Sequence, residues 1–168
     1  PTHQITLESW VYPTATSGDP DVVSMIVNKE EFFPSGTIAQ YELGRKNTGD
    51  CSPDAGIPTG NLAFFLGGVS GLPSQCRGWI DGGTFLPLNA WSHVALTFDG
   101  AAVRAYVNGI LSRELPASGT LTTTNGKLRI GARNQSTGEQ VQSSRWTGMI
   151  DEVQVLNRAL SAAEIQDI

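Results

Sequence analysis

The chain has little charge, little histidine and no long apolar run, and these shortages exclude whole classes of function. Lys, Arg, Asp and Glu make up 16% of the 168 residues, below the share of about 25% in an average domain. The formal net charge is −5 and no basic cluster occurs, so nucleic-acid partners are not expected, because backbone phosphates require a basic face. No apolar segment approaches the roughly 20 residues that span a bilayer, so membrane insertion is not expected either.

Glycine, serine and threonine are by contrast frequent, and apolar residues alternate with polar ones over short segments. The chain contains 19 glycines. Residues 5–13 and 93–98 alternate, and Asp99-Gly100 and Asn108-Gly109 are turn signals. About ten such segments are separated by turn residues, which is the pattern of an antiparallel β-sandwich. We therefore predict one all-β domain over residues 1–168.

Only the C-terminal residues have a helical pattern. Ser161 and Glu164 have the spacing of a capping box, in which each side chain binds the other residue's backbone N–H. Leu160 before the cap and Ile165 after it can form a hydrophobic staple. The sequence therefore predicts a short helix or a single turn from about Ala162.

The two cysteines, Cys51 and Cys76, lie in segments rich in glycine, proline and serine. Neither has a histidine nearby, so this even pair suits a disulfide better than a metal site, with two free thiols as the alternative. A disulfide would indicate an oxidising compartment, because such bonds are rare in the cytosol. We therefore predict a Cys51–Cys76 bridge and a secreted or cell-surface location.

An ordered set of motifs resembles a known family. The motifs are ITLESWVYP, MIVNK with YELG, WSHVALTFDGAAVRAYVNG, KLRIG and WTGMIDEVQVLNRALSAAEI. In this order they resemble the laminin-G-like (concanavalin A-like) jelly-roll domains, nearest to the bacterial secreted branch related to pentraxins. The resemblance implies two antiparallel sheets packed face to face, extracellular binding of glycans or proteins, and frequent use of Ca²⁺. The family's usual first strand, before ITLESWV, is expected to be missing here.

Asp151 is the first candidate for a metal site. It has the parity of Val153 and Val155, so on a regular strand it points toward the side that these valines bury, where a carboxylate needs a strong partner. In related jelly rolls an Asp at this place binds a structural Ca²⁺, an ion that prefers hard oxygen ligands. Bonds to backbone N–H groups are the alternative. The resemblance to pentraxins also places Glu30 and Glu31 at a position that supplies calcium ligands.

The polar ligand-binding candidates lie in a loop. By the same resemblance, Arg133, Asn134 and Gln135 fall where pentraxins have a second run of calcium ligands. An arginine in place of a carboxylate argues against a metal there. Together with Glu139, these side chains could instead bind a sugar through hydrogen bonds.

The aromatic candidates are Trp79, in a segment that departs from the family pattern, and Phe33, in a loop without strand periodicity. Both could act as stacking platforms for a sugar ring, and the alternative is that they cover the edge of the sandwich. Trp10, Trp91 and Trp146 match core or near-core positions of the family. We interpret these three tryptophans as packing residues.

No catalytic apparatus is visible in the sequence. Jelly-roll glucanases place an acid and a nucleophile in an E-x-D-x-x-E run, a spacing that is absent here. His93 has no evident nucleophile or orienting carboxylate, so we interpret it as structural. We therefore predict a non-catalytic carbohydrate-binding (lectin-like) module of a larger secreted or cell-surface protein, with calcium as a structural cofactor. A protein-interaction or adhesion domain is the second hypothesis, and a glycoside hydrolase is the third.

Overall fold

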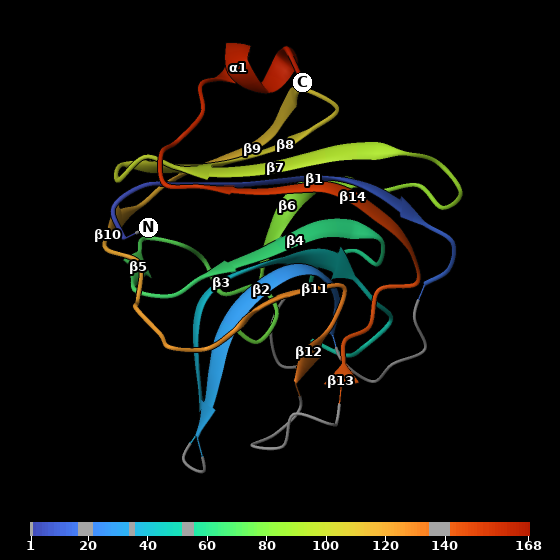
Figure 1. Cartoon of the computed structure of the whole chain (residues 1–168), viewed down its shortest axis with the longest axis horizontal. Coiled ribbons are helices and arrows are strands. Elements are labelled where there is room, and N and C mark those ends of the chain that lie inside the picture. The colour runs from blue at the N-terminus through green and yellow to red at the C-terminus, as the bar shows by residue number, and fades with distance from the viewer. Residues whose placement is uncertain (1, 17–21, 34–35, 52–55, 135–141) are drawn as a thin grey trace.

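Two five-stranded antiparallel sheets face each other across the molecule (Figure 1). The structure is a computed structural model that describes residues 2–16, 22–33, 36–51, 56–134 and 142–168. The first sheet has the strand order β14-β1-β7-β8-β9, formed by Gly148–Leu156, Ile5–Pro13, Ser92–Phe98, Ala102–Val107 and Ile110–Pro116. The second sheet has the order β11-β2-β3-β4-β6, formed by Leu128–Ile130, Val23–Phe33, Gly36–Lys46, Asn61–Leu66 and Ile80–Phe85.

Two short ribbons and one helix complete the described elements. The ribbons pair β5 with β10 and β12 with β13, which are Val69–Ser70, Ser118–Gly119, Arg133–Asn134 and Gln142–Ser143. The helix α1 spans Ala162–Gln166. The predicted fold class, an all-β antiparallel sandwich with a short C-terminal helix, is confirmed. None of the helices formed by the described residues is long and apolar enough to cross a membrane.

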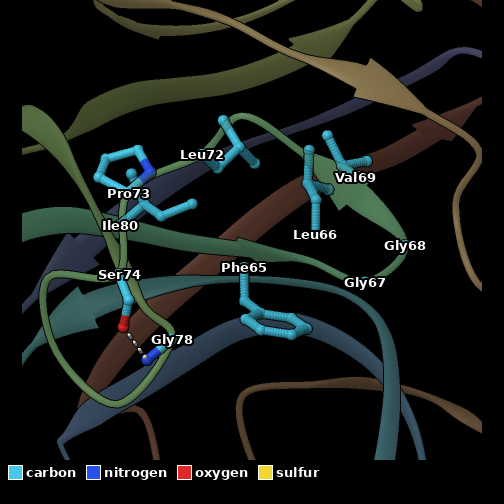
Figure 2. A pocket seen from close by; sticks show the side chains of 10 residues that line it. All are labelled: Phe65, Leu66, Gly67, Gly68, Val69, Leu72, Pro73, Ser74, Gly78 and Ile80. Atoms are coloured by element: carbon cyan, nitrogen blue, oxygen red, sulfur yellow. Dashed lines mark hydrogen bonds between the residues drawn. The ribbon is translucent and has the colours of Figure 1, made fainter.

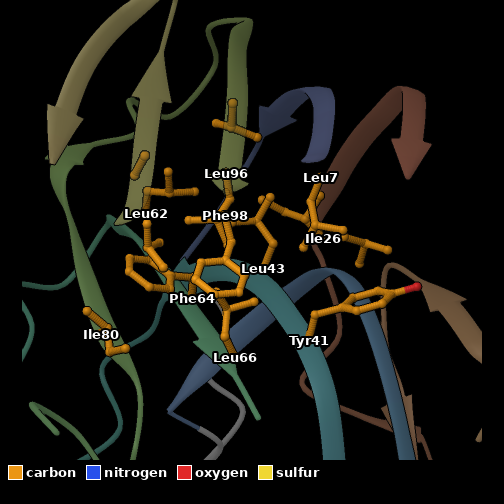
Figure 3. Close-up of a cluster of buried hydrophobic side chains, with 14 of the residues drawn as sticks. Leu7, Ile26, Tyr41, Leu43, Leu62, Phe64, Leu66, Ile80, Leu96 and Phe98 are labelled. Carbon is orange, nitrogen blue, oxygen red and sulfur yellow. The ribbon is translucent and has the colours of Figure 1, made fainter. Parts of the chain in front are cut away.

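The main core lies between the two sheets, where the alternating strands place their apolar side chains. Leu7, Leu96 and Phe98 of the first sheet are fully buried. Figure 3 shows them opposite Leu43 and Phe64 of the second sheet. Burying a side chain of this size stabilises the fold by about 1.5–3 kcal/mol, so this layer supplies much of the driving force for folding.

The predicted turn at Asn108-Gly109 is present and connects β8 to β9. Both residues have positive φ angles, 51° and 75°, as the type I′ hairpin turn requires. The Asn108 side chain also accepts a hydrogen bond from the His93 backbone N–H at 2.8 Å. This turn is therefore tied to the start of β7.

The C-terminal helix begins with the predicted capping box. Ser161 Oγ accepts a hydrogen bond from the Glu164 N–H, and the Glu164 carboxylate accepts one from the Ser161 N–H. Leu160 and Ile165 are buried in one small cluster with Tyr106. The helix thus packs against the outer face of the first sheet. Figure 1 shows it on the side of this sheet that is turned away from the second sheet.

A second apolar cluster covers part of the outer face of the second sheet. Cys51 and Cys76 are joined in a disulfide, which confirms the predicted bridge. The bond links the segment before β4 to the segment before β6. Trp79 and Met25 are buried in the same cluster. The loops that depart from the family pattern therefore form a small core of their own, closed by the disulfide.

Candidate functional site

A β-bulge in β14 determines where two acidic residues lie. Glu8 of β1 pairs with Gln154, but Trp10, two residues further along β1, pairs with Asp151, three residues back along β14. The extra residue is accommodated at Glu152, whose φ of 49° lies in the left-handed region. Ser9 of β1 therefore lies opposite two residues of β14, Glu152 and Val153, as in a β-bulge.

Asp151 consequently does not point into the sandwich. The prediction that it points toward the side that Val153 and Val155 bury is therefore wrong. Ile150 and Val153 pack against the main core, whereas Asp151 and Glu152 are both exposed. Asp151 Oδ1 accepts a hydrogen bond from the Glu152 N–H at 2.9 Å, which stabilises the bulge. The alternation argument failed because one inserted residue reverses the parity of every residue beyond it.

Aromatic rings lie next to this bulge on the outer face of the first sheet. Trp10 and Tyr12 share one face of β1, and Trp91 and His93 share one face at the start of β7, because residues two apart on a strand point the same way. The Trp10 ring lies 5.4 Å from the His93 ring, and the Tyr12 ring lies 5.5 Å from the Trp91 ring. His93 is 3% exposed, but Trp91 is 43% exposed. The interpretation of Trp91 as a packing residue is therefore incomplete, because much of its indole faces solvent.

Trp10, Trp91, Asp151 and Glu152 line an open hollow of about 370 Å³. Pockets that bind small molecules typically have volumes of about 300–1,000 Å³ and combine an apolar wall with a few polar groups. Here two indoles provide the apolar wall, and two carboxylates provide hydrogen-bond acceptors. The hollow can therefore hold a ligand that has one apolar face and donor groups along its edge.

Two buried titratable groups adjoin Trp10 on the same face of the sheet. Glu8 Oε2 lies 3.9 Å from His93 Nε2, and neither atom has a hydrogen-bond partner among the described residues. Burial raises the pKa of Glu8, an effect that Arg158 opposes, and burial lowers the pKa of His93. The neutral imidazole is thus favoured, so His93 places no full positive charge beside the hollow at neutral pH.

The outer face of the second sheet carries a buried charged cluster. The fully buried Glu30 carboxylate accepts hydrogen bonds from Arg133 Nη2 at 2.5 Å, Arg133 Nε at 3.2 Å and Asn28 Nδ2 at 2.7 Å. Glu42 Oε1 lies 3.7 Å from the same Arg133 guanidinium. Burial raises the pKa of Glu42 to about 8; the Arg133 charge opposes this rise, and Glu30 adds to it. At neutral pH, Arg133 therefore pairs with Glu30 while Glu42 is mostly protonated.

These contacts do not fit the predicted calcium ligands. Both Glu30 oxygens already have donors, and Glu31 Oε2 accepts hydrogen bonds from Thr124 Oγ1 at 2.9 Å and the Asn125 N–H at 3.0 Å. Asp151 lies on the other sheet. In the part of the chain that the structure describes, no three His, Cys, Asp or Glu side chains converge on a possible metal position. The two predicted calcium positions, Asp151 and the pair Glu30 and Glu31, thus lie on different sheets, and a structural calcium ion stays a prediction.

Two predicted sugar-binding residues, Trp79 and Arg133, meet at a smaller cavity of about 160 Å³, which Arg77 and Ser144 also line. Trp79 is 6% exposed because it packs beside the disulfide, so it offers no open ring face. The prediction of a stacking platform at Trp79 is contradicted, and the alternative, that it covers the sandwich, describes its position. Phe33 is 39% exposed at the end of β2, and it is not among the residues that line this cavity.

The remaining polar candidates stay predictions. Asn134 lies in β12, where its backbone pairs with Gln142. Gln135 and Glu139 lie outside the described residues. Of the polar candidates, the structure therefore describes the contacts of Arg133 alone, which pairs with Glu30.

An apolar groove of about 250 Å³ lies beside the turn between β4 and β5 (Figure 2). Its lining residues are Phe65, Leu66, Gly67, Gly68, Val69, Leu72, Pro73, Ser74, Gly78 and Ile80. The one polar side chain among them, Ser74, accepts a hydrogen bond from the Gly78 N–H at 3.1 Å. The groove therefore has few groups that could orient a polar ligand, and it is a weaker candidate than the hollow at Trp91.

The arrangement of the two sheets agrees with the sequence motifs, and a family comparison decides the assignment. The family described as the concanavalin A-like lectin/glucanases superfamily matches residues 1–166. The chain belongs to this superfamily. A search of curated proteins found no match.

Solved structures with this concanavalin A-like fold are distant in sequence. Domain 4 of the extracellular arabinanase AbnA from Geobacillus stearothermophilus, solved with arabinotriose, superposes with a TM-score of 0.61 at 18% identity over 99% of the chain. A heptameric pentraxin from Limulus polyphemus gives 0.59 at 17% identity over 99%. A Bacteroides ovatus protein, provisionally described as carbohydrate binding, gives 0.70 at 17% identity over 98%. The chain spans 66%, 70% and 40% of these proteins, so the comparisons show a shared fold.

Of the residues that line the hollow, sequence reasoning singled out Asp151, for a metal, and missed Trp10, Trp91 and Glu152 as binding residues, although part of the signal was available. Trp10 has the parity of Glu8 and Tyr12, and Trp91 has the parity of His93, so all of them belong to the face turned away from the core. That parity alone could have suggested aromatic side chains on an outer surface. The bulge that adds Glu152 has no comparable signal, because the residue is not a glycine and the strand pattern continues on both sides.

Proposed function

We propose that the protein is a non-catalytic carbohydrate-binding module that holds sugar rings in the hollow at Trp10, Trp91, Asp151 and Glu152. The observation that carries the proposal is the 43% exposure of the Trp91 indole at the wall of an open hollow that also presents two exposed carboxylates. The C–H face of a pyranose is apolar and gains free energy when an aromatic ring covers it. Its hydroxyl groups at the same time need acceptors, which carboxylates supply.

The positions of the acidic groups support binding without catalysis. Glycosidases place two carboxyl groups on either side of the bond that they cleave, about 5–5.5 Å apart in retaining enzymes and 6.5–9.5 Å apart in inverting ones. Asp151 and Glu152 are instead consecutive residues of one bulge at one side of the hollow. The buried pair on the other sheet, Glu30 and Glu42, is engaged with Arg133. These positions support a binding role over a catalytic one.

A structural calcium ion stays a prediction, and the proposed binding of sugar in the hollow does not depend on it. The proposed location of the protein and its proposed role as one module rest on the disulfide and on the comparisons of fold. The Cys51–Cys76 bond is compatible with an oxidising, extracellular environment. Because the chain covers 40% of one structural neighbour and 66% of another, we also propose that it acts as one module within a larger secreted or cell-surface protein.

A glycan array tests the proposal directly. The array is probed with the wild-type protein, with Trp91→Ala and with Phe85→Ala, each in Ca²⁺ and in EDTA. Phe85 is a matched control, because it is an aromatic residue that is 53% exposed on the other sheet. We expect the wild type and Phe85→Ala to bind the same glycans in both buffers, and Trp91→Ala to lose at least tenfold in affinity. An empty array, or a Trp91→Ala variant that binds like the wild type, would contradict the proposal.

A further inference from the structure

The two carboxylates of the hollow have no cationic partner among the described residues, unlike the buried Glu30 of the second sheet, which pairs with Arg133. Within residues 2–16, 22–33, 36–51, 56–134 and 142–168, arginines lie beside Glu30, Glu42, Asp99, Glu114 and Glu164, and Glu8 lies beside the neutral His93. None involves Asp151 or Glu152. One oxygen of Asp151 accepts the Glu152 N–H, which stabilises the bulge without neutralising either charge.

Two arginines of the first sheet and of the segment after it are paired with other acids. Arg158 Nη1 pairs with Glu164 at 2.7 Å, and Arg104 pairs with Asp99 and Glu114. His93, which contacts Trp10, is buried, and burial favours its neutral form. The hollow therefore combines two aromatic faces with two uncompensated negative charges, on a chain whose net charge is −5.

This combination favours one kind of sugar. An ammonium group held within about 6 Å of a ring centroid is attracted by the negative face of an aromatic ring, and tryptophan is the best of the aromatic side chains in this respect. A carboxylate adds a charge-assisted hydrogen bond to the same ammonium. An amino sugar carries a protonated amine directly on its ring, so one residue can stack on an indole and reach a carboxylate at once. A uronic acid would instead bring a third negative charge to Asp151 and Glu152.

We propose that the hollow selects glycans that contain sugars with a free, protonated amino group. This inference rests on the proposed function, because it specifies the class of sugar that the same site takes. Trp91 and Trp10 hold the ring, and Asp151 and Glu152 bind the ammonium group. N-acetylation removes the charge of the amine, so the acetylated form of the same glycan is bound more weakly.

The test compares three ligands of equal length by calorimetry in low salt at about pH 6, where the sugar amine is protonated. They are glucosamine oligomers, their N-acetylated counterparts and galacturonic acid oligomers. We expect the glucosamine oligomers to bind at least tenfold more tightly than the N-acetylated ones, and the uronic acid oligomers not to bind. Raising the salt concentration should reduce this preference, because exposed charge pairs are screened.

Variants separate the role of charge from that of stacking. Asp151→Asn combined with Glu152→Gln keeps the shape of the hollow and removes its charge. We expect it to abolish the preference for the free amine while weak binding of the N-acetylated oligomers remains. Asp167→Asn, which neutralises an exposed acid at the end of α1, is the control and should bind like the wild type.

The outcomes distinguish this inference from the proposed function. Equal or tighter binding of the N-acetylated or uronic acid oligomers, still lost in Trp91→Ala, would overturn the amino-sugar assignment and leave carbohydrate binding intact. No binding of any of the three oligomers would also overturn the amino-sugar assignment, and an empty glycan array would in addition overturn carbohydrate binding. Lysine oligomers that bind as tightly as glucosamine oligomers would also overturn the assignment, because the site would then recognise an amine without its sugar.

Discussion

Acidic side chains on the outer faces of the two sheets differ in burial and in ion pairing. On the second sheet Glu30 and Glu42 are buried; Arg133 compensates the Glu30 charge, and burial keeps Glu42 mostly protonated. On the first sheet Asp151 and Glu152 are exposed beside Trp91 without a cationic partner among the described residues. A carboxylate that is buried with its counter-ion stabilises or specifies the fold, whereas an exposed and unpaired one remains available to a ligand.

The covering of the two faces explains this difference. Over the second sheet, the loops joined by Cys51–Cys76 and the ribbon that carries Arg133 cover much of the strands' outer surface. Over the first sheet, α1 covers one region at Leu160 and Ile165 and leaves the strands near Trp91 open. The second face is therefore the better place to look for effects on stability, and the first for effects on binding.

The largest expected effect is on the buried cluster. Arg133→Ala leaves the Glu30 charge buried without its partner, so we expect the free energy of unfolding to fall by about 3–5 kcal/mol. Urea denaturation measures this loss. Adding Glu30→Gln to Arg133→Ala should recover part of it, because the uncompensated charge is then removed. Arg129→Ala, on β11, is the control, since Arg129 makes an exposed hydrogen bond to Lys127 O.

A loss below about 1 kcal/mol in Arg133→Ala would show that the cluster is not held by this ion pair. The comparison of the two faces would then lose its electrostatic basis. Glycan binding at the Trp91 hollow should be the same in every one of these variants that folds, because the hollow lies on the other sheet.

Removal of the disulfide should have the next largest effect. The bond joins residues separated by 25 positions, and the closure of a loop of this size stabilises a protein by about 3 kcal/mol. We expect Cys51→Ala with Cys76→Ala to lower the melting temperature and to leave affinity at the hollow unchanged. An unchanged melting temperature would show that the second apolar cluster holds its loops without the bond.

The pH dependence of stability should identify Glu42. Its pKa of about 8 in the folded state lies above the ordinary value of 4.5, so the folded state binds this proton more tightly than the unfolded state does. The stability linked to this group is complete below pH 4.5 and is lost as the pH rises through about 8. Between pH 5 and 8, the free energy of unfolding should fall by on the order of 3 kcal/mol in the wild type.

Glu42→Gln should flatten this part of the pH profile, which denaturation at a series of pH values would show. His93 acts with the opposite sign, because burial lowers its pKa and stability is lost as the pH falls through the folded value. The effect of His93 on stability is therefore confined to pH values below its ordinary pKa of 6.5. This effect is the same in the wild type and in Glu42→Gln. An identical slope in the wild type and in Glu42→Gln would refute the assignment.

The smallest expected effects are those of the hollow on stability. Asp151→Asn and Glu152→Gln should each change the free energy of unfolding by less than about 0.5 kcal/mol, as is usual for exposed positions. If Asp151 were buried, as strand parity suggested, its substitution would be much the more destabilising of the two. Thermal denaturation of the two single variants therefore checks the position of the bulge.

The sequence alone was sufficient for the fold and for several local features. The alternation of residues 93–98, the turn at Asn108-Gly109, the capping box at Ser161 and the Cys51–Cys76 pair all appear in the structure as expected. Each depends on residues close in sequence or on a residue type with few possible roles. Hydrophobic alternation, positive φ angles and thiol pairing are therefore readable without knowledge of distant contacts.

The candidate site was decided by tertiary structure. Whether Asp151 faces the core depends on one additional residue in the pairing of β14 with β1. The register of this pairing cannot be read from the sequence of one strand alone. Trp79 and Trp91 are both tryptophans near strand ends, yet the disulfide loops bury one and nothing described covers the other. The burial of a side chain depends on all the residues that pack around it, many of which are distant in the sequence. The sequence therefore determined which aromatic and acidic side chains the protein carries, and the folded structure determined which of them a ligand can reach.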